Sequence, residues 1–294
     1  MTAADLRRFS RVFASRAGIV LPVFALVCLA QLPLIFNPGY FSHDELQWAA
    51  RADTPAGQRL PWFAWTAVET YQYRPLTFNL WLLLSRWWFE QPQLFHAVCV
   101  FWGAANAAML AALGRRFGMG PTAAALGALA FALGPYAVFV HGWVGTMADL
   151  LWLSCALGIG LIVARVSRPW WAFCAAATLT LIGLLGKEAA ITIPPLLAVA
   201  WWFDARKPAW MAATIGAGGV AAVYLGLRYQ ALLQSPRDGA QYALSAWHPP
   251  LRWIEYQLFA QIPTLLETFT TLARGVDGRV AVAGLLWLAL CAAL

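Results

Sequence analysis

Residues 95–117, FHAVCVFWGAANAAMLAALGRRF, form an apolar stretch that ends beside two adjacent arginines. A helix needs about 20 mainly apolar residues to cross a bilayer. Runs of about this length recur along the chain, at residues 17–37, 93–113, 121–140, 148–165, 170–186, 189–203, 209–227, 252–273 and 279–294. The pattern predicts an all-α, polytopic transmembrane helical bundle that forms a single domain over residues 1–294. Because the sequence stops at Leu294, inside the last apolar run, we also expect further chain beyond it.

The composition agrees with a membrane protein. Hydrophobic residues make up 61% of the chain and the mean hydropathy is +0.63, whereas a soluble domain is nearer half apolar. A net charge of +7 can indicate a nucleic-acid partner, but here the basic residues are spread between the apolar runs. The five cysteines all lie inside apolar runs without metal-ligand spacing, so neither a disulfide framework nor a zinc site is indicated.

One apolar run, PLTFNLWLLLSRWWF at residues 75–89, is short for a span and contains Asn79 and Arg86. Tryptophan and tyrosine crowd around it, as in an interfacial belt. If this run lies in the outer interface, the inner segments carry 12 of the 20 basic residues, namely Arg7, Arg8, Arg11, Arg16, Arg115, Arg116, Arg165, Arg168, Arg206, Lys207, Arg274 and Arg279. Cytoplasmic loops are rich in lysine and arginine. We therefore expect a cytoplasmic N-terminus and a long outer loop, residues 38–92, with amphipathic interfacial helices.

Under this topology the less common ionisable residues collect on the outer face. They are Asp44, Glu45, Arg74, His141, Asp149, Lys187 and Glu188, followed by Arg228, Arg237, Asp238 and Arg252 in the later loop. A charged side chain at the centre of a membrane helix costs about 2.5–3.5 kcal/mol on insertion scales. Such residues persist mostly where they pair or line a polar cavity, so their shared face indicates a functional site.

Each of these residues also has a structural interpretation. Asp44 and Glu45 suit a solvated loop or the first turn of a helix. Asp149 fits a capping box with Thr146. His141 could be an interfacial histidine, Lys187 could extend from a helix end towards water with Glu188 as its solvated neighbour, and Arg74 could anchor an interfacial helix. Arg228 and Arg252 are expected to be ordinary helix-end residues.

The order of several short motifs resembles a known superfamily. These motifs are HDE at residues 43–45, YRPLTFNLWLLL at 73–84, the stretch at 95–117, HGWVGTMADLLW at 141–152 and GKEAAITIPPLL at 186–197. Their order is similar to that of the GT-C superfamily of polytopic glycosyltransferases. It is nearest to the polyprenyl- or dolichyl-phosphate-mannose O-mannosyltransferases of the transmembrane-and-TPR type, and more distantly similar to the lipid A aminoarabinose transferases. Where the mannosyltransferase pattern usually has an acid and an arginine, this chain has Thr146, Met147 and Ala148.

The resemblance implies transfer of a sugar from a polyprenyl-phosphate donor to an acceptor hydroxyl on the extracytoplasmic face of a plasma membrane, here expected to be bacterial. Asp44 or Glu45 would act as the base of an inverting displacement. Arg74 and Lys187 would bind the donor phosphate, and the Trp-rich segment 62–88 would receive the prenyl chain. His141, Asp149 and Glu188 would support the site, with a divalent metal left open. Two alternatives remain: a transporter or flippase of lipid-linked substrates, and a non-catalytic membrane scaffold.

Overall fold

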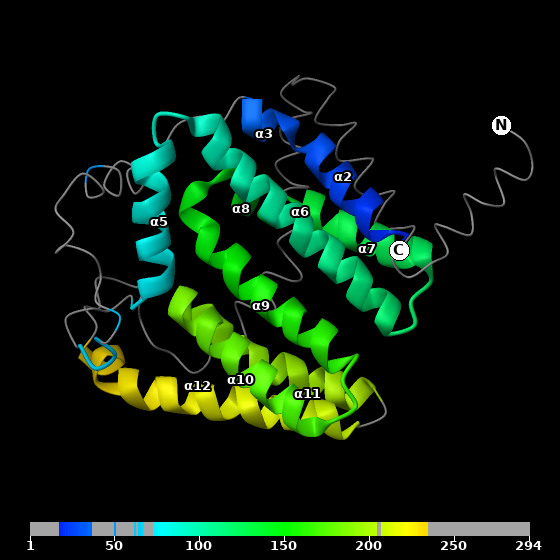
Figure 1. Ribbon diagram of the computed structural model, residues 1–294, viewed down its shortest axis with the longest axis vertical. Helices are drawn as coiled ribbons and strands as arrows, with labels where there is room; N and C mark the ends of the chain where they lie inside the picture. The colour runs from blue at the N-terminus through cyan, green and yellow to red at the C-terminus, as the bar shows by residue number, and fades with distance from the viewer. Residues whose placement is uncertain are drawn as a thin grey trace, which may run out of the picture. The chain divides into compact units, whose positions relative to one another are not determined.

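The computed structural model describes residues 18–36, 50, 62, 64–67, 73–204 and 207–234. The chain divides into two compact units, Met1–Gln234 and Ser235–Leu294, and all described residues belong to the first. Every regular element among them is helical, which confirms the all-α class (Figure 1). The expected spans at 252–273 and 279–294 lie outside the described residues, as do Asp44 and Glu45.

The α-helices are α2 (Val20–Ala30), α3 (Leu32–Phe36), α5 (Pro75–Trp88), α6 (Pro92–Arg116), α7 (Pro121–Leu133), α8 (Pro135–Gly142), α9 (Met147–Val163), α10 (Pro169–Gly186), α11 (Ile193–Phe203) and α12 (Pro208–Gln234). Short 3₁₀ helices precede α9, at Val144–Thr146, and α11, at Glu188–Thr192. Several α-helices begin at a proline, because the fixed φ of proline suits the first helical position and its missing N–H has no partner there anyway.

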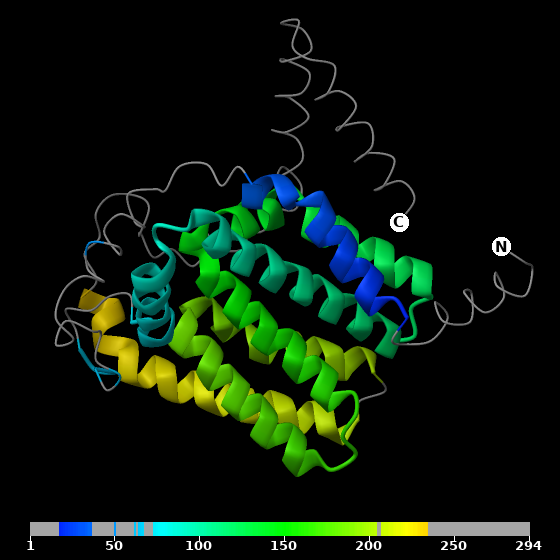
Figure 2. The ribbon, with the colours of Figure 1, turned by 45° about the horizontal axis from the view of Figure 1, so that its top comes forward.

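The long helices pack side by side, with α10 between α9 and α12, and α6 between α9 and α2 (Figure 2). Small residues allow this close approach. Ala172 and Ala176 of α10 share one buried cluster with Ala213 and Ala217 of α12. A second cluster joins alanines of α6 to those of α7. Successive helices run in opposite directions. As a result, α6, α9 and α11 end at one end of the bundle, and α7, α10 and α12 begin at that same end.

Within the described residues, four helical segments are long and apolar enough to cross a membrane: Pro92–Arg116, Val144–Val163, Pro169–Gly186 and Pro208–Ala231. They define an all-helical membrane protein. Two expected spans are shorter than predicted. Within 17–37, the helix stops at Gln31 and α3 adds only 5 residues, since Pro33 removes a backbone donor from the interior of the predicted helix. Within 189–203, a 3₁₀ turn leaves an α-helix of 11 residues.

The expected span at 121–140 is broken. Pro121–Leu133 and Tyr136–Gly142 meet at 61°. The break lies at Gly134, whose backbone is extended (φ −67°, ψ 153°) immediately before Pro135. Proline disfavours the α conformation in the residue before it, so the Gly134–Pro135 pair ends α7 and starts α8 in a new direction.

Helix α5 confirms the helix expected within 75–89 and crosses one end of the bundle (Figure 1). The Thr77 hydroxyl donates to the carbonyl of Gly186 at the end of α10, 2.7 Å away. Trp81 Nε1 donates to the carbonyl of Val144, just before α9, at 2.9 Å. Leu84 packs in the same apolar cluster as Phe95 at the start of α6. One face of α5 therefore covers three helix ends, as expected of a helix lying along an interface.

Candidate functional site

The site lies where the helix α10 ends and the backbone becomes extended for one residue. This helix ends at Gly186, and Lys187 takes an extended conformation (φ −160°, ψ 139°) before the 3₁₀ helix that begins at Glu188. Neighbouring side chains of extended backbone point to opposite sides. Lys187 and Glu188, although adjacent, thus reach different partners.

Lys187 binds Asp149, which lies in the first turn of α9. The Nζ atom is 2.8 Å from Oδ1 and 2.6 Å from Oδ2 of the carboxylate. Trp152 Nε1 also donates to Asp149 Oδ1 at 3.2 Å. Both charged side chains are 26% exposed, so the pair is partly shielded from water. The capping-box interpretation of Asp149 is wrong, because the hydroxyl of Thr146 lies 2.6 Å from the carbonyl of Trp143 and makes no cap hydrogen bond.

Glu188 binds Arg74, the residue immediately before α5. Arg74 Nε donates to Glu188 Oε2 at 2.7 Å, and Nη2 donates to Oε1, so the contact is bidentate. The exposed fractions are 17% for Arg74 and 50% for Glu188. Burial raises the pKa of the Glu188 carboxyl, but hydrogen bonds from Arg74 outweigh it and hold that pKa below its ordinary value. Burial lowers the pKa of Arg74, yet hydrogen bonding to Glu188 leaves it above its ordinary value.

The two ion pairs form one electrostatic network, which we call the paired network: Arg74, Asp149, Lys187 and Glu188. The charge of Asp149 also attracts that of Arg74, and the charge of Lys187 also attracts that of Glu188. The hydrogen bond from Thr77 to Gly186 connects the helices that carry the two pairs. Residues separated by 114 and 38 positions in the sequence therefore meet at one end of the bundle.

Arg228 is a further charged residue whose burial the sequence interpretation missed. It is 2% exposed in α12, and its Nη1 atom donates to the carbonyls of Trp65 at 3.1 Å and Ala67 at 2.9 Å. Its guanidinium lies 5.4 Å from the ring centre of Tyr73. Arg228 thus ties α12 to the segment leading into Arg74, and it is not an ordinary helix-end residue. Its position inside an apolar helix, one turn after Tyr224, was the available signal.

The residues that contact His141 lie outside the paired network. It is 2% exposed, and its Nδ1 atom lies 2.8 Å from Gln31 Oε1. Gln31 in turn donates from Nε2 to the carbonyl of Ala132 at 2.9 Å. A Cβ atom at Gly103 would meet the His141 ring at 2.2 Å, so the ring lies directly against α6. These contacts give His141 a role in joining α8 to the end of α2.

The paired network can hold anions more readily than metals. Among the described residues, no group of three or more histidines, cysteines and carboxylates is placed to bind a metal ion. Asp149 and Glu188 each already bind a cation. The paired network has two cations and two carboxylates, and the buried Arg228 adds a third cation beside it. A phosphate that displaced a carboxylate would find both an ammonium and a bidentate guanidinium donor.

This protein is, by its fold, an all-helical membrane protein with a charged network at one end of the bundle. No known family model, characterised protein or solved structure matches the chain.

Proposed function

We propose that the protein is a GT-C-type membrane glycosyltransferase. It moves a sugar from a polyprenyl-phosphate donor to an acceptor hydroxyl on the extracytoplasmic face. The observation that supports this most strongly is the paired network beside α5, because it joins Arg74 and Lys187, the two cations of the predicted phosphate site. A tryptophan-bearing helix beside them suits a donor whose phosphate sits at the interface and whose chain lies in the bilayer.

In the proposed reaction the donor phosphate exchanges with Glu188 and Asp149 as the partner of Arg74 and Lys187. The bond from the anomeric carbon to the phosphate oxygen breaks, and negative charge grows on the departing polyprenyl phosphate. Cations held in place before the reaction stabilise that charge without reorganisation. Binding energy that grows along this coordinate raises turnover as well as affinity.

The base is assigned to Asp44, with Glu45 beside it. It takes the proton of the acceptor hydroxyl as the hydroxyl oxygen attacks the anomeric carbon. Within the paired network, Arg74 holds the pKa of Glu188 low and Lys187 is bound to Asp149. A carboxylate held by a cation is a weaker proton acceptor, so Glu188 suits this role less.

The activity is tested by replacing Asp44 with asparagine. Purified Asp44→Asn should bind the polyprenyl-phosphate donor normally, while sugar transfer falls about 10²–10⁴-fold, the range for a positioned base. Asp204→Asn is the control, since that carboxylate pairs with Lys207 three residues away. Near-normal transfer by Asp44→Asn would move the role to Glu45, whereas no transfer by the wild type would reject catalysis in favour of a scaffold.

A second candidate is a transporter or flippase of lipid-linked substrates. The 61° bend between α7 and α8 and the extended break at Lys187 favour it, because broken helices are common in transporters. Proteoliposomes with a fluorescent lipid-linked sugar separate the two functions. Flipping without transfer to any acceptor would support the transporter. Transfer without flipping would support the enzyme.

A further inference from the structure

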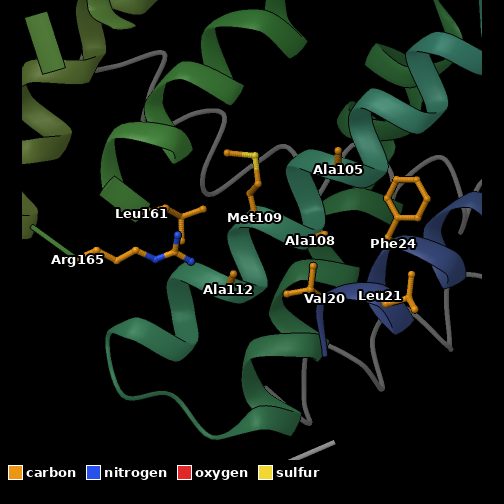
Figure 3. Close-up of a pocket in the computed structure, with 9 residues that line it drawn as sticks. All are labelled: Val20, Leu21, Phe24, Ala105, Ala108, Met109, Ala112, Leu161 and Arg165. Atoms are coloured by element: carbon orange, nitrogen blue, oxygen red, sulfur yellow. The ribbon is translucent and has the colours of Figure 1, made fainter. Parts of the chain in front are cut away.

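A second feature lies on the bundle away from the paired network: an apolar groove of about 460 Å³ (Figure 3). Its size falls in the range of about 300–1,000 Å³ usual for ligand sites. Val20, Leu21 and Phe24 of α2 form one wall, and Leu161 and Arg165 at the end of α9 form the other. The floor is α6, through Ala105, Ala108, Met109 and Ala112.

The groove follows from the packing of α6. Helices α2 and α9 lie on either side of it (Figure 2). Ala105, Ala108 and Ala112 repeat at helical spacing on the surface between them, so small side chains form a low floor. From Ala105 to Ala112 the floor runs about 10 Å along the helix, at about 1.5 Å per residue. The floor therefore has room for part of one extended hydrocarbon chain.

Arg165 is the one charged residue among those lining the groove. In Figure 3 its side chain extends towards Leu161 and Ala112. Arg165 is exposed and has no ion-pair partner among the described residues. Arg115, Arg116 and Arg168 lie near the same end of the bundle, where α6 and α9 end and α10 begins. An apolar slot with a free cation at its mouth is complementary to an anionic headgroup attached to a hydrocarbon chain.

We propose that this groove binds an anionic glycerophospholipid, with its phosphate at Arg165 and one acyl chain over the alanine floor of α6. Basic pockets between transmembrane helices on the cytoplasmic side are suited to such lipids. This site is independent of the proposed transferase activity. It lies at the opposite end of the long helices from Arg74 and Lys187, which argues against the sugar donor as its occupant.

The N-terminal segment is a poor alternative occupant. Residues 1–17 contain Arg7, Arg8, Arg11 and Arg16 against the single acid Asp5. Arg165 would repel this excess of positive charge. A segment from residues 235–294 or a second copy of the chain would instead leave no room for lipid, and the protein would then retain none.

The experiment is native mass spectrometry of the full chain released from nanodiscs of equal phosphatidylglycerol and phosphatidylcholine. Wild type should retain phosphatidylglycerol about fivefold more than phosphatidylcholine, the preference that one basic residue near an anionic headgroup provides. Arg165→Gln should remove this preference, whereas Arg168→Gln, an exposed neighbour outside the groove, should keep it. Ala112→Phe should remove retention of the lipid by filling the floor.

Leu21→Trp provides a second way to fill the groove if Ala112→Phe does not fold, because Leu21 is 72% exposed and tolerates a larger side chain. Equal retention of both lipids, or equal loss in Arg165→Gln and Arg168→Gln, would overturn the proposal. So would a wild type that retains no lipid, since the groove would then be covered by protein. Preferential retention of added polyprenyl phosphate over phosphatidylglycerol would identify the wrong lipid class and would also overturn it.

Discussion

The two ends of the described bundle use charge in different ways. At the α5 end, ion pairs join residues 114 and 38 positions apart, and the arginine is only 17% exposed. At the opposite end, the pair Lys207–Asp204 joins residues 3 positions apart, with Lys207 59% exposed. Arg115 there donates to the carbonyl of Met119, also a local contact. The first end is connected by contacts between distant parts of the chain, whereas the other makes local contacts and exposes Lys207, Arg165 and Arg168.

This difference separates two uses of basic residues in a membrane protein. Exposed cations at loop ends need no partner, because they serve orientation and contact with anionic lipid. Partly buried cations need carboxylates or carbonyls, because an uncompensated charge away from water is costly. The paired network and Arg228 are of the second kind, so removing their partners should have larger effects than changes at the other end.

The largest contrast expected is in labelling from outside. In a variant without the native cysteines, Glu90→Cys should react with an impermeant thiol reagent on intact cells, and Met119→Cys should react only after permeabilisation. Both side chains are exposed, one near the start of α6 and one after its end. If only Met119→Cys reacted with the reagent on intact cells, the orientation would be the opposite of the one assigned, and the site could not be extracytoplasmic.

A second test concerns turnover. Arg74→Ala and Lys187→Ala should each lower sugar transfer about 10²–10³-fold, as does loss of one preorganised donor to a developing negative charge. The double variant should lose less than the product of the two, because both cations share one phosphate. Lys207→Ala, a cation at the other end, should stay within about twofold of wild type, since an exposed pair contributes little. Full additivity with unchanged donor affinity would show that the two cations serve separate purposes.

Arg228 should contribute to stability more than the exposed arginines do. Arg228→Met leaves the carbonyls of Trp65 and Ala67 without this donor, so the free energy of unfolding should fall by about 1–3 kcal/mol. Arg228→Lys should not restore it, because an ammonium lacks the planar guanidinium that lies over the Tyr73 ring. Denaturant unfolding in detergent measures the change, with the exposed Arg168→Met as control. An equal change in the free energy of unfolding for both variants would show that Arg228 contributes no more to stability than a surface arginine.

The smallest expected effect is the pH dependence of the Arg74–Glu188 pair. Because the pKa of Glu188 is lowered in the folded protein, its contribution is fully present above the unfolded value of about 4.3. It is lost as the pH falls through the lower folded value. Since Glu188 is 50% exposed, the amount should stay below about 1 kcal/mol. Glu188→Gln should flatten the dependence of the melting temperature on pH below about pH 4. An unchanged pH dependence would show that the pair does not contribute to stability.

Local sequence was a sound guide to element type and a weaker one to element length. It predicted α5 as a helix and the long helices α6, α9, α10 and α12, because apolar runs of sufficient length make the helical backbone self-satisfying in a bilayer. It overestimated the runs 17–37, 121–140 and 189–203. In the first two, Pro33 and the Gly134–Pro135 pair break the helix at single positions that an average over twenty residues hides.

The sequence by itself determined that this protein is helical, that it is built for a membrane, and that unusual ionisable residues are concentrated near certain helix ends. Each of these properties depends on residues close together in the chain. Only the tertiary structure decided that Lys187 pairs with Asp149, that Arg74 pairs with Glu188, that Arg228 is buried and that His141 binds Gln31. Those contacts depend on how α5, α8, α10 and α12 pack against the other helices, and the spacing of residues within one helix contains no information about its neighbour.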